Sequence, residues 1–124
     1  MKIKVSGASG AALDWMVAKA QGFEVYHSAM LNGYIKHGFW VSGYYPGDLN
    51  SWVPLNKLAY STDWQLGGPI LDHHISHLED FAGEGWSATC NGVMVDGDTA
   101  LIAVYRAYVM SKLGDEVEVP DELV

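Results

Sequence analysis

The pattern of hydrophobic residues predicts two helices, one near each end of the chain. In residues 11–21, four apolar side chains repeat at the spacing of one helix face. They are Leu13, Met16, Val17 and Ala20. Ser9 is the expected N-cap, and Gly22 stands just past the end, as is typical of a helix C-terminus. Trp15 lies off this face, and we expect it to pack on a neighbouring sheet.

Residues 99–113 are apolar on almost every side. Such a pattern predicts a helix that is largely buried and laid across a sheet. Asp98 is the expected N-cap, and Gly114 follows the predicted last residue. Lys112 falls in the last turn, where the helix dipole favours a cation.

Short strands are predicted between these helices. The candidates are "FEVYHSA", "HGFWVSGYY", "WSATC" and "GVMVD". A "PGD" turn at 46–48 closes the second of them. "NSWVPL" is expected to be an edge strand, because Pro54 cannot donate to a strand ladder. Asn91 and Gly92 form a favourable two-residue hairpin turn between the last two strands.

Residues 61–85 show no clear period. "GGPIL" is typical of a turn that enters a strand, and "DHHISHLEDFAGEG" indicates a loop or a short helix. After Gly114, five of the last ten residues are acidic, which indicates a mobile tail. We therefore predict one α+β domain over residues 1–114 and an acidic tail over 115–124. An antiparallel sheet of three to five strands is expected to pack against the two helices.

Charge and cysteine content exclude several classes of function. Seven Lys and Arg stand against fifteen Asp and Glu, and no basic run is present, so double-stranded nucleic acid is an unsuitable partner. No apolar run is long enough for a bilayer. Asp14 and Lys19 interrupt the N-terminal apolar stretch, so we expect no signal peptide. Cys90 is the single cysteine and is expected to be a small buried residue in a reducing cytoplasm.

The segment "DHHISH" is the strongest candidate for metal chemistry. On a helix, His77 would share a face with His73 and with His74, and Cys90 offers a sulfur ligand. The HExxH and CxxC patterns are missing, so we favour a solvated loop and predict no metal and no cofactor. A small hydrolase that uses these histidines is a weaker alternative, because no nucleophile–base pair, GxSxG elbow or P-loop is present. We predict no catalytic residue.

Arg106 is an unusual residue for an apolar helix, because removing a guanidinium from water costs free energy unless it is paired. Three explanations are open. Arg106 pairs with an internal carboxylate (Asp14, Asp63 or Asp98), it binds an acidic ligand such as phosphate, or it reaches the surface along its stem.

The stretch "STDWQLGGPI" at 61–70 combines several groups that suit ligand binding. Thr62 and Asp63 offer hydrogen bonds, and Trp64 offers a flat face for stacking. Gly67 and Gly68 allow a backbone to approach closely. The alternative is an Asx-type turn that leads into a strand, with Trp64 in the core.

Three segments together resemble the NinX-like proteins of lambdoid phages and their prophage relatives. They are "MKIKVSGASGAALDWMVAKAQG", "YSTDWQLGGPIL" and "TALIAVYRAYVMSKLGDEVEVPDEL". The resemblance covers about half of the chain, and the closing "SKLGDEVEVP" is its most specific part. The best-matching positions are Gly10, Ala11, Asp14, Trp15, Ser61, Thr62, Asp63, Trp64, Gly67, Gly68, Pro69, Arg106, Lys112 and Gly114. The resemblance implies an accessory phage protein of unknown function in the cytoplasm of the bacterial host, and it adds weight to a pocket near Trp64.

Two functions lead from these observations. The first is a non-enzymatic protein that binds a small anionic or nucleotide-like molecule through Thr62, Asp63, Trp64, Gly67, Gly68 and Arg106. In a phage, such a protein would sequester a host immune signal. The second is a protein-interaction module that engages or inhibits a host or phage protein through its aromatic surface and acidic tail. The aromatic content is also compatible with a homodimer.

Overall fold

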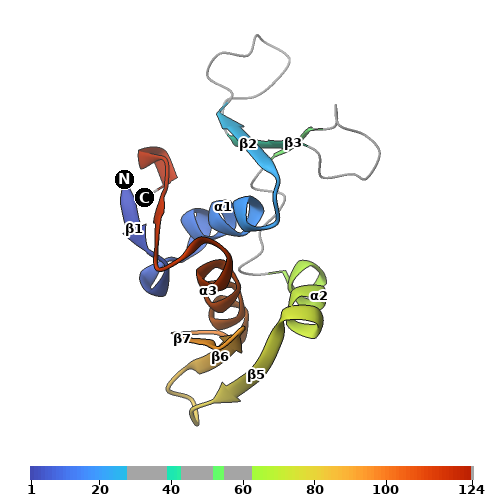
Figure 1. The fold of residues 1–124 in the computed structure, drawn as a ribbon, viewed down its shortest axis with the longest axis vertical. Helices are drawn as coiled ribbons and strands as arrows, with labels where there is room; N and C mark the ends of the chain where they lie inside the picture. Colours follow the sequence, from blue (N-terminus) through green and yellow to red (C-terminus); the bar gives the residue numbers. More distant parts are fainter. Residues whose placement is uncertain (28–38, 43–51, 55–62, 124) are drawn as a thin grey trace.

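The computed structural model describes residues 1–27, 39–42, 52–54 and 63–123, and Figure 1 shows how its helices and strands are arranged. In chain order, the α-helices are α1 (Gly10–Ala20), α2 (Trp64–His74) and α3 (Ala100–Leu113). The strands are β1 (Lys2–Lys4), β2 (Glu24–His27), β3 (Phe39–Ser42), β4 (Trp52–Pro54), β5 (Ile75–Asp80), β6 (Trp86–Cys90), β7 (Val93–Gly97) and β8 (Glu116–Glu118). Two short 3₁₀ turns, η1 (Val5–Gly7) and η5 (Asp121–Leu123), complete the described elements. The predicted α+β class is confirmed.

Both predicted helices are present, and their apolar faces form the core. Trp15 is buried, as expected, within α1. The predicted cap of α3 is wrong by one residue. Thr99, not Asp98, is the N-cap, and its hydroxyl oxygen accepts a hydrogen bond from the backbone N–H of Ile102 at 3.2 Å. The side chain directly before the first helical residue is the one that reaches this N–H.

Helix α2 replaces the predicted turn and strand. Asp63 is its N-cap, and Asp63 Oδ1 accepts a hydrogen bond from the N–H of Gln65 at 2.9 Å. The prediction failed because Gly67, Gly68 and Pro69 are poor helix formers. Most helix stability in proteins comes from tertiary packing, and α2 buries Gly67 and Ile70 against the core.

The prediction of a loop or short helix over residues 72–85 is wrong for 75–80, which form a strand, whereas 81–85 form a loop as expected. Residues 72–74 end α2, and β5 begins at once with Ile75. The next two strands were predicted correctly, and Asn91 and Gly92 have the positive φ angles (50° and 82°) that a two-residue hairpin turn requires.

The strands form three small antiparallel sheets rather than the single predicted sheet. Within the described residues, their orders are β1-β8, β2-β3-β4 and β5-β6-β7. The β4 strand lies at an edge, as expected from Pro54. The predicted turn at 46–48 lies outside the described residues. In Figure 1, α3 passes through the middle of the molecule, with the β5-β6-β7 sheet on one side of it and α1 and α2 around it.

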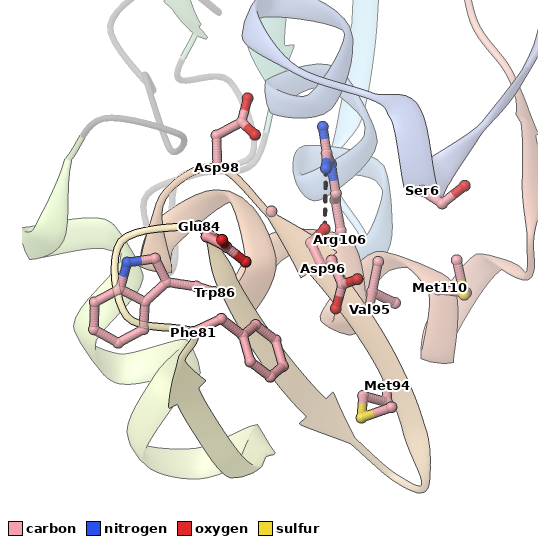
Figure 2. Close-up of a pocket in the computed structure, with 12 residues that line it drawn as sticks. Ser6, Phe81, Glu84, Trp86, Met94, Val95, Asp96, Asp98, Arg106 and Met110 are labelled. Atoms are coloured by element: carbon pink, nitrogen blue, oxygen red, sulfur yellow. Dashed lines mark hydrogen bonds between the residues drawn. The ribbon is translucent and has the colours of Figure 1, made fainter.

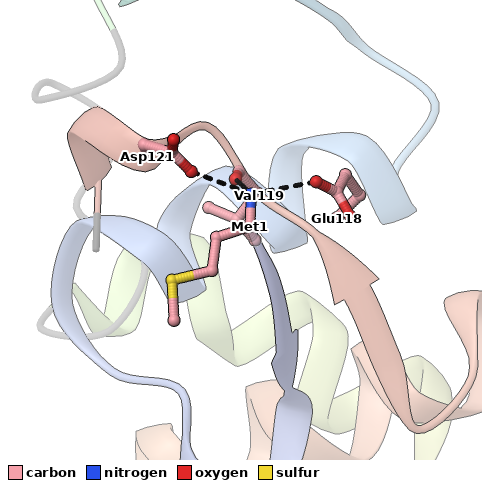
Figure 3. Close-up of polar contacts among 4 residues, drawn as sticks. All are labelled: Met1, Glu118, Val119 and Asp121. Carbon is pink, nitrogen blue, oxygen red and sulfur yellow. Dashed lines mark hydrogen bonds and ion pairs between the residues drawn. The ribbon is translucent and has the colours of Figure 1, made fainter.

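The acidic C-terminal segment, predicted as a mobile tail, is packed on the domain. Strand β8 pairs with β1, and Val119 is fully buried. The ammonium group of Met1 donates to Glu118 Oε1 at 2.9 Å, to the Val119 carbonyl at 2.8 Å and to Asp121 Oδ1 at 3.0 Å (Figure 3). Strand alternation explains the arrangement, because Glu116 and Glu118 are exposed while Val117 between them packs against the core.

Candidate functional site

A pocket of about 460 Å³ opens between β7, the second half of α3 and the β5–β6 turn (Figure 2). Its lining residues come from η1, the β5–β6 turn with the first residue of β6, β7 with the connection that follows it, and α3. They are Ser6, Phe81, Glu84, Gly85, Trp86, Met94, Val95, Asp96, Gly97, Asp98, Arg106 and Met110. Phe81 and Met94 leave 44% and 69% of their surface exposed, so the pocket presents apolar side chains to solvent.

The pocket lies along the outer edge of strand β7. Strand β7 pairs with β6 on one side and, among the described residues, with no strand on the other. Its residues alternate between exposed and buried, with Met94 and Asp96 exposed and Val95 and Gly97 buried. Both kinds line the pocket, so the pocket reaches both faces of the sheet at this edge.

Arg106 ties this edge to the N-terminal segment. Its Nε donates to the carbonyl oxygen of Ala8 at 2.7 Å, and its Nη1 donates to the carbonyl oxygen of Asp96 at 3.0 Å. Figure 2 draws the second of these bonds, with the guanidinium between Asp98 and Ser6. The hydrogen-bond partners of Arg106 are thus two backbone carbonyls, which none of the three predicted explanations named.

Burial and a nearby carboxylate act on Arg106 in opposite directions. Partial desolvation lowers the pKa of the guanidinium below its ordinary value, and the charge of Asp98 partly offsets this by raising the pKa. Arginine remains protonated in proteins, so the pocket holds a fixed positive charge. Asp98 is one of the three carboxylates that the sequence suggested as partners, and its role here is electrostatic.

The rim of the pocket is negative overall. The carboxylates of Glu84, Asp96 and Asp98 line it, against the one guanidinium of Arg106. An anion would therefore meet three like charges for each opposite charge. A cationic group would meet three opposite charges and one like charge, and a cleft with an excess of one sign of charge attracts the opposite sign.

The predicted ligand-binding stretch at 61–70 lies on different elements from this pocket. Thr62 is outside the described residues. Asp63 is used as the cap of α2, and Trp64 leaves 52% of its surface exposed at the first turn. Neither Asp63 nor Trp64 lines the pocket that holds Arg106.

The two glycines of this stretch differ in role. A Cβ atom on Gly67 would collide with the Leu101 side chain and would lie 2.8 Å from the hydroxyl oxygen of Tyr105. The close approach that Gly67 allows is therefore the contact of α2 with α3. A Cβ atom on Gly68 would meet nothing within 4 Å.

The histidines are spread over α2 and β5. The ring of His74 lies 5.1 Å from the ring of Tyr108, and His77 Nε2 lies 3.4 Å from Glu79 Oε2. His73 is exposed. Over the part of the chain that the structure describes, no three His, Cys, Asp or Glu residues are grouped as a metal site would require. Cys90 is buried, with its sulfur 3.2 Å from the hydroxyl oxygen of Ser111.

Sequence reasoning missed most of the pocket. Phe81, Glu84, Met94 and Asp96 were not singled out, because each is ordinary in its local context. One signal was present. The hairpin around Asn91 and Gly92 was predicted, and the outer strand of a hairpin is a sheet edge unless a further strand pairs with it.

Comparison with known families gives a single clear finding. The family model described as Bacteriophage P22, NinX matches residues 4–112. A search of curated proteins finds no match. None of the helices in the described ranges has the length and apolar character needed to cross a membrane.

Proposed function

Since this chain belongs to the phage NinX family, we propose that it is a phage accessory protein that works by binding another protein, without catalysis. The observation that carries the proposal is the pocket at the β7 edge, where exposed apolar side chains are surrounded by carboxylates. Apolar and aromatic side chains within a polar rim are the usual anatomy of a protein-interaction surface.

The composition of the pocket favours a protein partner over a small anion. Phe81 and Met94 are exposed on the same concave surface. Large exposed apolar side chains that gather in one place mark interaction sites more often than isolated ones do. The net negative rim works against a phosphate or nucleotide, because like charges repel at short range.

Site-specific crosslinking tests the proposal directly. A photoreactive amino acid replaces Met94 in the full chain, and the matched control carries it at Asp72, which is exposed on α2 and outside the pocket. The proteins are expressed in bacteria that carry the phage. We expect a discrete crosslinked protein with the Met94 probe that is absent with the Asp72 probe. Equal products at both positions, or none at Met94, would reject an interaction through this surface.

A second candidate is the binding of a small anion at Arg106, as the sequence suggested. Arg106 supports it, because Nε and Nη1 are each bonded to one carbonyl while the guanidinium has five N–H donors. Mass spectrometry of molecules released from the denatured protein tests this candidate after incubation in lysate of phage-infected bacteria. A stoichiometric anion that is lost in Arg106→Met and kept in Trp64→Ala would support it. An empty protein would reject it.

A further inference from the structure

We propose that the partner binds by adding an extended segment to the free edge of β7 as a fourth strand, and that this segment alternates apolar and basic residues. The inference rests on the proposed function and names the mode of binding and the chemistry of the partner. Edge strands carry a row of unpaired N–H and C=O groups, which makes them templates for another chain.

The direction of the backbone groups on β7 follows from Arg106. The carbonyl of Asp96 accepts a hydrogen bond from Arg106 and therefore points away from β6. In an antiparallel strand, the N–H and C=O of one residue point to the same side, and the side alternates from residue to residue. The N–H and C=O of Met94, two residues earlier, therefore also point outward, as does the N–H of Asp96.

The hairpin geometry agrees with this assignment. Val93 lies opposite Cys90 on the two sides of the two-residue turn, and Val95 lies opposite Ala88. The residues that flank a two-residue turn exchange hydrogen bonds, so Val93 and Val95 point toward β6 and Met94 points away. Among the described residues, no backbone hydrogen bond outside the regular elements involves Met94.

Arg106 leaves only part of the edge open. Its bond to the Asp96 carbonyl occupies the end of β7 that leads into α3. Three backbone groups stay available toward the hairpin turn, namely the N–H and C=O of Met94 and the N–H of Asp96. Antiparallel pairing of one residue with Met94 uses both of its groups, which sets the register of an added strand.

The two faces of the edge differ in chemistry. On the face toward α3, the pocket is lined by the apolar side chains of Val95 and Met110. On the opposite face, the side chains of Met94 and Asp96 are both exposed, and the carboxylate of Glu84 also lines the pocket (Figure 2). A Lys or Arg side chain on this face can lay its apolar stem against Met94 and its charge near the carboxylates. Successive side chains of an added strand point to opposite faces, so apolar residues on one face and Lys or Arg on the other match the edge.

Charge also separates this occupant from a second copy of the same chain. The protein has a net charge of -8, and Asp96 is part of the edge itself. Pairing two β7 strands would bring the carboxylates of both copies together. Charged side chains on an edge oppose such self-pairing, whereas a basic segment is attracted to the same carboxylates.

The probe is an eight-residue peptide with blocked ends, Lys-Val repeated four times. Its matched control has the same composition in the order Lys-Lys-Val-Val, repeated twice, which places both residue types on each face. Binding to the full chain is measured by fluorescence anisotropy, and amide hydrogen exchange is followed by NMR. We expect the alternating peptide to bind at least about fivefold more tightly and to protect the amides of Met94 and Asp96. The control keeps the same backbone groups but loses matched cross-strand side-chain pairs, and the loss of one or two such pairs corresponds to about this factor.

Met94→Pro and Met94→Ala separate the backbone from the side chain. Proline removes the outward N–H and is tolerated on an edge strand, whereas alanine keeps the N–H. We expect Met94→Pro to weaken binding of the alternating peptide at least about fivefold relative to Met94→Ala. Hydrogen exchange of the β6 amides checks that the hairpin persists. If the hairpin is lost in Met94→Pro, protection of the Met94 amide in the unmodified protein decides the question.

Three results would overturn the inference. They are equal binding of the two peptides, no protection of the Met94 amide when the peptide is bound, and a Met94 amide already protected in a dimer of the free protein. The last would assign the edge to a second copy. A crosslinked partner at Met94 that leaves the Met94 amide exchanging freely would preserve the proposed function and reject strand addition.

Discussion

The two sides, or flanks, of α3 differ in how closely they are packed: helix α2 lies against one side, and strand β7 lies against the other. Toward α2 the packing is closed, because Gly67 brings the two helices into contact at Leu101 and Tyr105. Toward the outer edge of β7 it is open, with a pocket, exposed Met94 and a half-buried Arg106. Gly67, which the sequence singled out, therefore marks packing, whereas Met94, an ordinary residue of a hairpin, is the one that is exposed beside the pocket.

The largest effect on stability is expected at Gly97, where the end of β7 packs directly on α3. A Cβ atom on Gly97 would lie 2.5 Å from the backbone N of Ala103, and a backbone has no rotamer with which to move away. Gly97→Ala should lower the free energy of unfolding by about 3 kcal/mol, the upper range for overpacking. Urea unfolding measures it. A loss below about 1 kcal/mol would show that β7 moves away from α3 without difficulty.

Arg106→Ala is expected to destabilise the fold by about 2 kcal/mol. It removes two charge-assisted hydrogen bonds and leaves the carbonyls of Ala8 and Asp96 without this donor. Arg106→Lys is the matched control and should recover part of the loss, because lysine reaches one carbonyl at a time. Thermal unfolding compares them. Equal stability of Arg106→Ala and the parent would show that these bonds contribute nothing net.

The closed flank is tested by two neighbouring glycines. Gly67→Ala should cost about 1–2 kcal/mol, because the new methyl group displaces Leu101 and Tyr105. Gly68→Ala should be close to neutral. Its Cβ meets nothing within 4 Å outside the neighbouring residues, and alanine favours a helix over glycine by about 0.5–1 kcal/mol, but the following Pro69 disfavours a helical residue that carries a Cβ. Chemical denaturation of both variants measures the difference. The comparison of the two flanks would break if the two substitutions had the same effect.

The smallest effect is expected at the chain terminus, which belongs to neither flank. Hydrogen bonds to Glu118 and Asp121 raise the pKa of the Met1 amino group above its ordinary value of 8.0. A raised folded-state pKa adds stability that is complete below pH 8 and is lost as the pH rises through the folded value. Acetylation of this amine should therefore lower the melting temperature at pH 7 and have little effect well above the folded pKa. An acetylation effect that is independent of pH would contradict this account.

The candidate site shows why local pattern was a poor guide to it. Trp64 and Gly67 were singled out because an aromatic ring and a glycine both suit ligand binding. In the structure, Trp64 is exposed on the first turn of α2, and Gly67 lies in the contact between α2 and α3. Arg106 was correctly seen as unusual. Its partners, the carbonyls of Ala8 and Asp96, lie 98 and 10 residues away, and no side-chain pattern identifies a backbone acceptor.

The sequence by itself determined the elements whose signals are local. The periodicity of α1 and α3, the Asn91-Gly92 hairpin and the α+β class follow from side-chain spacing and turn chemistry within a few residues. Only the tertiary structure decided that 64–74 is helical and that the acidic segment pairs with β1. In both cases distant packing outweighs weak or opposite local preference. The outer edge of β7, with which no described strand pairs, is of the same kind, because only the tertiary structure decides which strands lie side by side.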